Sequence, residues 1–129
     1  MMEMSKDEMR TIYEMAKAVY EDKSKLPACQ IYVQEKYAIS KRSFEGWFVP
    51  MFRYMIEGKT FKGSVPQSLK RYYLEKIYED FGIVGLENAL RSYKGTIEYY
   101  ESEKRVRKVG DKKIYEEFFN LLYGSKMHM

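Results

Sequence analysis

The sequence predicts an all-α protein, a compact bundle of about five to six helices forming a single domain over residues 1–129. Three observations support this class. Apolar residues recur at three- and four-residue steps along most of the chain, which is the period of one face of a helix. Serine, aspartate or proline precedes most of these segments, and glycine follows several of them, as at helix ends. No segment of useful length alternates between apolar and polar residues, as a strand would.

The first two helices are expected at residues 5–21 and 27–37. Ser5, with Glu8 three residues later, has the form of a capping box, in which two side chains bond the first backbone amides of a helix. An apolar stripe follows on one face: Met9, Ile12, Tyr13, Ala16, Val19 and Tyr20. Pro27 suits a first helical position because its missing N–H would be unpaired there. The second helix then continues through Ala28, Ile31 and Tyr32.

The third helix begins at Ser40, whose hydroxyl can cap it, and ends at Gly58. Its apolar face is the largest in the chain: Phe44, Trp47, Phe48, Met51, Phe52, Met55 and Ile56. Pro50 removes a backbone hydrogen bond inside it, so we expect a kink near Gly46 or two shorter helices. Together with the preceding helix it predicts a helix-turn-helix-like pair at about 27–57.

Three further helices are expected after a loop at residues 59–65. The fourth begins at Pro66 and stops at Gly82, and the fifth spans residues 86–100 and continues into charged sequence. The sixth is capped by Asp111 and closed by Gly124. Large apolar side chains at helical spacing belong to a core, to which we assign Trp47, Phe48, Phe52, Tyr73, Ile77 and Phe118.

Catalytic chemistry, a metal site and a cofactor are not expected. Cys29 is the only cysteine and predicts a small buried hydrophobe, and the only histidine, His128, stands next to the last residue. Gly58–Thr60 resembles the end of a phosphate-binding loop, but Arg53 stands where that motif needs glycine. No apolar run reaches the ~20 residues that cross a bilayer and no secretory signal begins the chain, so we expect a soluble, cytoplasmic protein.

Basic residues are gathered in two segments. Eight basic residues and two acids lie between Lys36 and Arg71, a net charge of +6, and residues 104–113 carry +5, although the whole chain carries only +4. Such segregation is typical of a surface that contacts phosphates, and a solvated charged face stays the alternative. The predicted nucleic-acid-binding residues are Lys41, Arg42, Arg53, Lys59, Lys62, Lys70, Arg71, Lys104, Arg105, Arg107 and Lys108. At helical spacing, Arg42, Gly46, Val49 and Arg53 share one face opposite the aromatic stripe.

Two resemblances point the same way. Val33–Phe48, with Ile39 and Ser40 at the turn, resembles the helix-turn-helix of tetracycline-repressor-type regulators, which usually carry glycine where Ala38 stands. Ser43–Glu101 resembles a helical domain found ahead of HNH-type nuclease domains in bacterial restriction-like proteins, here without the nuclease histidines. The resemblances imply a DNA-contacting module of bacterial or phage origin, with duplex DNA as partner and a role in restriction or phage defence. The alternative they leave open is a protein-interaction or inhibitor module that acts on a nuclease or another nucleic-acid enzyme.

Overall fold

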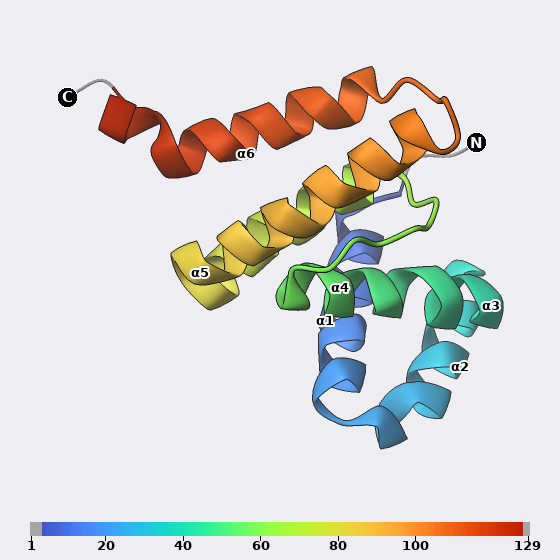
Figure 1. Ribbon diagram of the computed structural model, residues 1–129. Helices are drawn as coiled ribbons and strands as arrows, with labels where there is room; N and C mark the ends of the chain where they lie inside the picture. Colours follow the sequence, from blue (N-terminus) through green and yellow to red (C-terminus); the bar gives the residue numbers. More distant parts are fainter. Residues whose placement is uncertain (1–3, 128–129) are drawn as a thin grey trace. The chain divides into compact units, whose positions relative to one another are not determined.

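The computed structural model describes residues 4–127, and side chains up to Gly124, and every regular element in that range is a helix (Figure 1). The predicted all-α class is confirmed. The chain divides into two compact units: the first holds the residues up to Arg53 and Gly63–Tyr73, and the second holds Tyr54–Lys62 and the residues from Leu74 onward. The single domain stays a prediction, and each unit is described by itself. Within the described range, no helix has both the length and the apolar character that crossing a membrane requires.

The first unit begins with α1 (Lys6–Glu21), which starts and ends where the sequence predicts. The predicted capping box is confirmed, since the Glu8 N–H donates to the Ser5 hydroxyl at 3.1 Å and the Ser5 N–H donates to the Glu8 carboxylate at 3.4 Å. The buried face consists of Met9, Ile12, Tyr13, Ala16 and Val19. Tyr20, expected in the same stripe, is instead exposed and lies edge-on to Phe52.

Helix α2 (Leu26–Tyr37) follows a short 3₁₀ turn, η1 (Lys23–Lys25), and carries Pro27 in its first turn. It buries Cys29 and Val33, so the predicted buried cysteine is confirmed. The residues that defined its periodicity, Ala28, Ile31 and Tyr32, are exposed. Apolar residues occupy two sides of this helix, and spacing alone does not say which side packs inward.

The expected helix-turn-helix-like pair is present as two helices joined by three residues. Ala38 takes the left-handed conformation (φ 58°, ψ 30°) that ends α2, and the Ser40 hydroxyl accepts the Ser43 N–H at 3.0 Å to cap α3 (Lys41–Ser43). The chain stays helical through a π turn, η2 (Phe44–Phe48), into α4 (Val49–Glu57). Alanine therefore fills a left-handed position, a conformation that glycine adopts more readily than other residues.

Pro50 is accommodated by the π turn immediately before it. The Val49 N–H bonds the Phe44 carbonyl five residues back, so this turn holds one residue more than an α-helical turn. A helix can absorb the hydrogen bond that proline removes with such an irregularity. The helix is not split, and the expected break near Gly46 takes the form of this wider turn. Trp47, which lies in this turn and was assigned to the core, is only half-buried.

Aromatic rings form the core of the first unit. Tyr13 meets Phe52 and Tyr73 edge-on, with both ring-centroid distances at 5.5 Å. The Tyr73 hydroxyl donates to the Phe48 carbonyl at 2.8 Å, which fixes the first segment of α5 (Gln67–Ser102) against the end of the π turn. Burial raises the pKa of the Tyr73 phenol well above its ordinary value. The predicted core positions Phe48, Phe52 and Tyr73 are confirmed.

In the second unit, α5 changes direction at Gly82, where the helix was predicted to stop. Gly82 has φ 70° and ψ −156°, a conformation that side-chain-bearing residues rarely adopt. Residues 83–102 pack back against residues 74–81, and a Cβ at Gly85 would lie 2.4 Å from the Phe81 Cβ (Figure 1). Glycine at both positions is therefore required for this turn.

Helix α6 (Val109–Met127) completes the second unit. Among its described residues, the unit buries eleven apolar side chains: Met55, Phe61, Leu74, Ile77, Leu86, Ala89, Leu90, Tyr93, Ile97, Ile114 and Phe118. Asp111 was predicted to cap α6, but the helix starts two residues earlier, and Asp111 is buried and accepts the Tyr93 hydroxyl at 2.6 Å. Gly124 was predicted to close α6, but it lacks the positive φ of a glycine that ends a helix, and α6 continues to Met127.

Candidate functional site

The second basic segment forms an exposed loop between α5 and α6. The loop comprises residues 103–108 and is the orange connection in Figure 1. Its exposed cations are Lys104, Arg105 and Arg107. Arg105 has φ 54°, and the Val106 N–H bonds the Tyr100 carbonyl at 3.0 Å. The loop therefore folds back onto the last turn of α5 while its cationic side chains lie in solvent.

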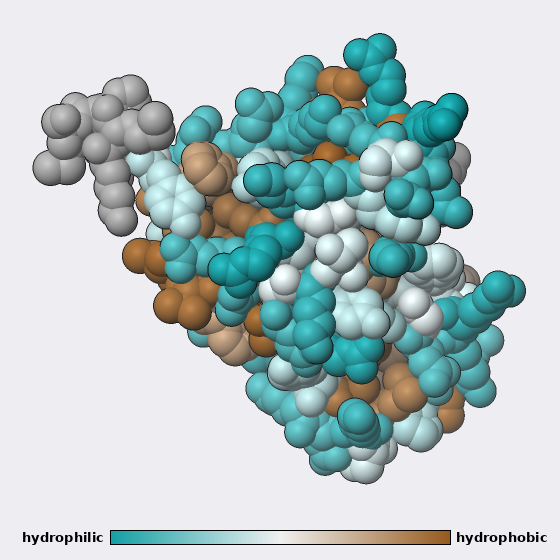
Figure 2. Space-filling model, in the orientation of Figure 1, coloured by the Kyte–Doolittle hydropathy of each residue, from teal (hydrophilic) through white to brown (hydrophobic). Residues whose placement is uncertain are grey.

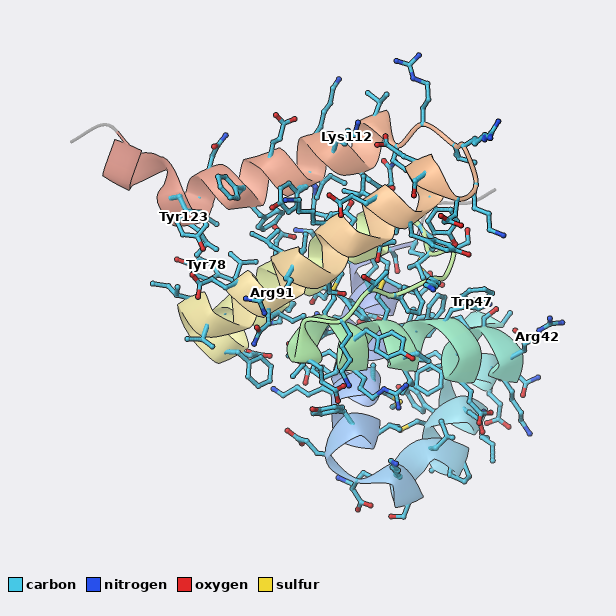
Figure 3. The ribbon with its side chains drawn as sticks, viewed as in Figure 1. Arg42, Trp47, Tyr78, Arg91, Lys112 and Tyr123 are labelled. Atoms are coloured by element: carbon cyan, nitrogen blue, oxygen red, sulfur yellow. The ribbon has the colours of Figure 1, made fainter. Side chains whose placement is uncertain are left out.

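Glu101 organises the base of this loop. Its carboxylate accepts the Lys108 N–H at 3.1 Å and lies 3.0 Å from the Lys112 ammonium, which Figure 3 shows near the start of α6. The hydrogen bonds from Lys112 and from the Lys108 backbone hold the pKa of the Glu101 carboxyl below its ordinary value. A hollow of about 340 Å³ is lined by Glu101, Arg105, Val106 and Arg107. Glu101 thus anchors the loop to the end of α5 and the start of α6. The guanidinium groups of Arg105 and Arg107 border the hollow.

Two tyrosines at the end of α5 bring the two predicted basic groups together. The rings of Tyr99 and Tyr100 meet edge-on with centroids 5.2 Å apart. The Lys62 ammonium lies 4.9 Å from the Tyr99 centroid, and the Lys108 ammonium lies 4.6 Å from the Tyr100 centroid. Cations at these distances are attracted to the face of an aromatic ring. Lys62 and Lys108, predicted in separate segments of the sequence, therefore border the same pair of rings.

Lys62 is placed there by the buried anchoring of its neighbour Phe61. The Phe61 N–H donates to the Thr96 hydroxyl at 3.2 Å, and the same hydroxyl donates to the Phe61 carbonyl at 2.7 Å. A Cβ at Gly95 would lie only 2.1 Å from the Thr60 hydroxyl oxygen, so glycine lets the loop approach α5 closely. These contacts are made by residues 59–62 and α5 within the second unit.

The first unit carries a separate set of predicted residues. Lys41 and Arg42 are exposed in the first turn after the Ser40 cap, and Figure 3 shows Arg42 extending away from the ribbon. The Gln30 side-chain amide donates to the Glu45 carboxylate at 2.9 Å and links α2 to this helix. Both cations therefore project from a well-anchored helix start.

Three predicted details of the first basic segment, Lys36–Arg71, need correction or refinement. The expected common face of Arg42 and Arg53 stays a prediction, and the extra residue of the π turn between them shifts the later residues by roughly 100° from the α-helical spacing on which it was based. Lys70 is only 5% exposed and is not available to bind a polyanion, although its long apolar stem suits such burial. Arg71 is half-buried, and Lys59 is exposed and lies 3.2 Å from the Glu57 carboxylate.

Sequence reasoning did not select Tyr99, Tyr100 or Glu101 as site residues. The available signal was their position, two aromatics and an acid directly before a basic run. Elsewhere, burial raises the pKa of the Cys29 thiol, and its possible partner His128 lies outside the described residues. Within residues 4–127, no group of three histidine, cysteine or acidic side chains is arranged to hold a metal ion.

Comparison with known proteins gives no match to a family model, to a curated protein or to a solved structure. The resemblances to tetracycline-repressor-type regulators and to domains ahead of HNH-type nucleases therefore stay predictions. The functional argument depends on the contacts of this chain alone.

Proposed function

We propose that the chain is a non-catalytic nucleic-acid-binding module that contacts the phosphates of duplex DNA. The observation that carries the proposal is the arrangement at the end of α5, where Lys62 and Lys108 flank Tyr99 and Tyr100 beside an exposed basic loop. Arginine binds phosphate oxygens with two donors at once. Such contacts supply most of the affinity of a nucleic-acid-binding protein and make it depend steeply on salt.

A charge-reversal pair tests the proposal. Binding of a labelled 20-base-pair duplex is measured by fluorescence anisotropy between 50 and 200 mM NaCl. The variant Arg105→Glu/Arg107→Glu is expected to bind at least 10-fold more weakly at 50 mM NaCl. The matched control, Lys23→Glu/Lys25→Glu, changes the net charge by the same amount at the exposed turn η1 and is expected to bind like the wild type.

Two outcomes would refute the proposal: no binding of any duplex at 50 mM NaCl, or an equal loss in the loop variant and the control. An equal loss would mean that only net charge matters. A third variant, Lys41→Glu/Arg42→Glu, tests whether the first unit joins the interface. Unchanged binding by that variant would confine the interface to the second unit.

A specific observation also supports the protein-interaction alternative. Phe81, Ile83 and Val84 are exposed at the turn of α5, Ile83 by 59% and Val84 by 68%. Figure 2 shows a brown surface at the left edge of the molecule, where Figure 1 places the turn of α5. Clustered exposed apolar side chains are typical of protein contacts. If Val84→Glu abolished copurification of a nuclease while the chain bound no nucleic acid, this second function would replace the first.

A further inference from the structure

The second unit contains another hollow, and none of its lining residues belongs to the basic loop at residues 103–108. A cavity of about 210 Å³ lies between the later part of α5 and α6. Leu90 belongs to its lining from the buried core, and two groups of side chains complete it. From α6 come Tyr115, Phe119 and Tyr123, and from α5 come Glu87, Arg91 and Lys94. The cavity therefore has an aromatic wall and a charged wall.

The aromatic wall is a ladder of three rings spaced four residues apart on α6. The Tyr115 and Phe119 centroids are 5.9 Å apart with the planes at 28°, and the Phe119 and Tyr123 centroids are 4.8 Å apart. The core positions of α6 are others, Ile114 and Phe118, which are buried. Phe119 is 38% exposed, so the ladder presents aromatic surface to the cavity in addition to packing against the helix pair.

The charged wall carries two cations and one acid. Arg91 and Lys94 are exposed and stand three residues apart, so they share one side of α5. The Arg91 guanidinium donates to the Asn88 side-chain oxygen at 2.8 Å and lies beside Gly58, and Figure 3 shows Arg91 and Tyr123 on the two helices that border the cavity. The Glu87 carboxylate accepts the Tyr123 hydroxyl at 2.7 Å. A carboxylate in this position can also accept an amino hydrogen from a base edge.

The size of the cavity limits what it can hold. A cavity of about 150 Å³ is sufficient for a benzene molecule, whereas pockets for drug-sized ligands start near 300 Å³. A volume of about 210 Å³ therefore fits one flat ring system. The neighbouring cations suit a ring that carries a phosphate. A nucleotide has both groups, and its base must be unpaired to enter.

We propose that this aromatic–cationic cavity binds one unpaired nucleobase of a single strand, stacked on Phe119, with the adjoining phosphate on Arg91 and Lys94. The inference extends the proposed nucleic-acid-binding function and depends on it. The cavity would bind nucleic acid that has an unstacked base, whereas the basic loop would contact the phosphates of a duplex. Stacking of bases on exposed aromatic rings is the general way in which proteins hold single strands.

The test compares a labelled 12-nucleotide oligo(dC) with a blunt duplex by fluorescence anisotropy at 50 mM NaCl. Phe119→Ala is expected to weaken oligo(dC) binding about 5- to 150-fold, the range for one lost stacked base, and to leave duplex binding unchanged. Phe119→Tyr retains an aromatic ring at this position and is expected to bind oligo(dC) like the wild type. Leu121→Ala removes an exposed apolar side chain of the same helix outside the cavity and serves as the matched control. Circular dichroism verifies that each variant keeps its helicity.

Three outcomes would overturn the inference: Phe119→Ala binds oligo(dC) like the wild type, it loses duplex and single strand equally, or Leu121→Ala loses as much. If Arg105→Glu/Arg107→Glu lost the duplex while Phe119→Ala had no effect on the single strand, only the cavity assignment would fail. If the wild type bound neither probe, the proposed function itself would fail.

Discussion

Replacing Thr96 by valine should release the segment that carries Lys62. Valine has nearly the shape of threonine and a similar helix propensity, so the change removes the hydroxyl without opening a cavity. It removes the hydroxyl that bonds both the Phe61 N–H and the Phe61 carbonyl, at a position where Phe61 and Thr96 are each 5% exposed. One intramolecular hydrogen bond contributes about 0.5–1.5 kcal/mol to stability. For the two bonds lost, we expect a loss of about 1–3 kcal/mol in the free energy of unfolding.

Urea denaturation followed by circular dichroism measures this loss. Thr96→Ser is the matched control, because it keeps the hydroxyl and removes only a methyl group, for about 1 kcal/mol. Amide hydrogen exchange gives a second measurement, since the Phe61 amide should lose its protection in the valine variant and keep it in the serine variant. A valine variant within about 0.5 kcal/mol of the wild type, well below the expected loss for two hydrogen bonds, would refute the reasoning. So would a serine variant that is as unstable as the valine one.

Two further predictions concern titration. Glu101 has a pKa below its ordinary 4.5, so its contribution to stability is fully present above pH 4.5 and is lost as the pH falls through the lowered value. The difference between the urea midpoints of the wild type and Glu101→Gln should therefore shrink as the pH falls below 4.5, and a constant difference would contradict the assigned contacts. Burial raises the pKa of the Cys29 thiol, so a thiol reagent at pH 8 should modify the native protein at least 10-fold more slowly than the urea-unfolded chain, and equal rates would show that Cys29 is accessible.

Features that depend on neighbouring residues could be predicted from the sequence. The capping box of α1 is an example, because Ser5 and Glu8 satisfy each other's amides within one turn. The reversal at Gly82 is another, since the residue type itself permits the required φ. The all-α class follows in the same way from periodicity. Each of these features is determined by residues that are close together in the sequence.

Features that depend on packing could not be predicted in this way. Pro50 indicated an irregular helix, but the form of the irregularity, a π turn, changed the relation between Arg42 and Arg53. Asp111 has the residue type of a cap, yet a hydroxyl eighteen positions earlier, on Tyr93, bonds it in the core. Lys62 and Tyr99 are distant in sequence, and only the anchoring of Phe61 to Thr96 brings them together. For the candidate site, the sequence therefore indicated the charges but not their aromatic support.

The number of basic side chains that can contact a nucleic acid depends on how each one is placed in the structure. Lys70 is buried and is not counted, and Lys62 and Lys108 lie over the rings of Tyr99 and Tyr100. The smallest interface consists of the exposed loop cations Lys104, Arg105 and Arg107. Each neutralised phosphate contributes a slope of about −0.9 to the logarithmic dependence of affinity on salt, so three contacts give about −2.7, or a loss of about 40-fold between 50 and 200 mM NaCl.

The salt slope can therefore distinguish the possible interfaces. With Lys41 and Arg42 added, five contacts give a slope of about −4.5 and a loss of about 500-fold over the same range, whereas all eleven predicted residues would give about −10 and a loss of about a million-fold. A slope near −10 would contradict the burial of Lys70, since it requires all eleven residues to contact phosphates. A wild-type slope near −2.7 would match the three loop cations. If the magnitude of the slope then fell by about 1.8 in Arg105→Glu/Arg107→Glu, two of the phosphate contacts would be located in the α5–α6 loop, because that variant changes no other residues.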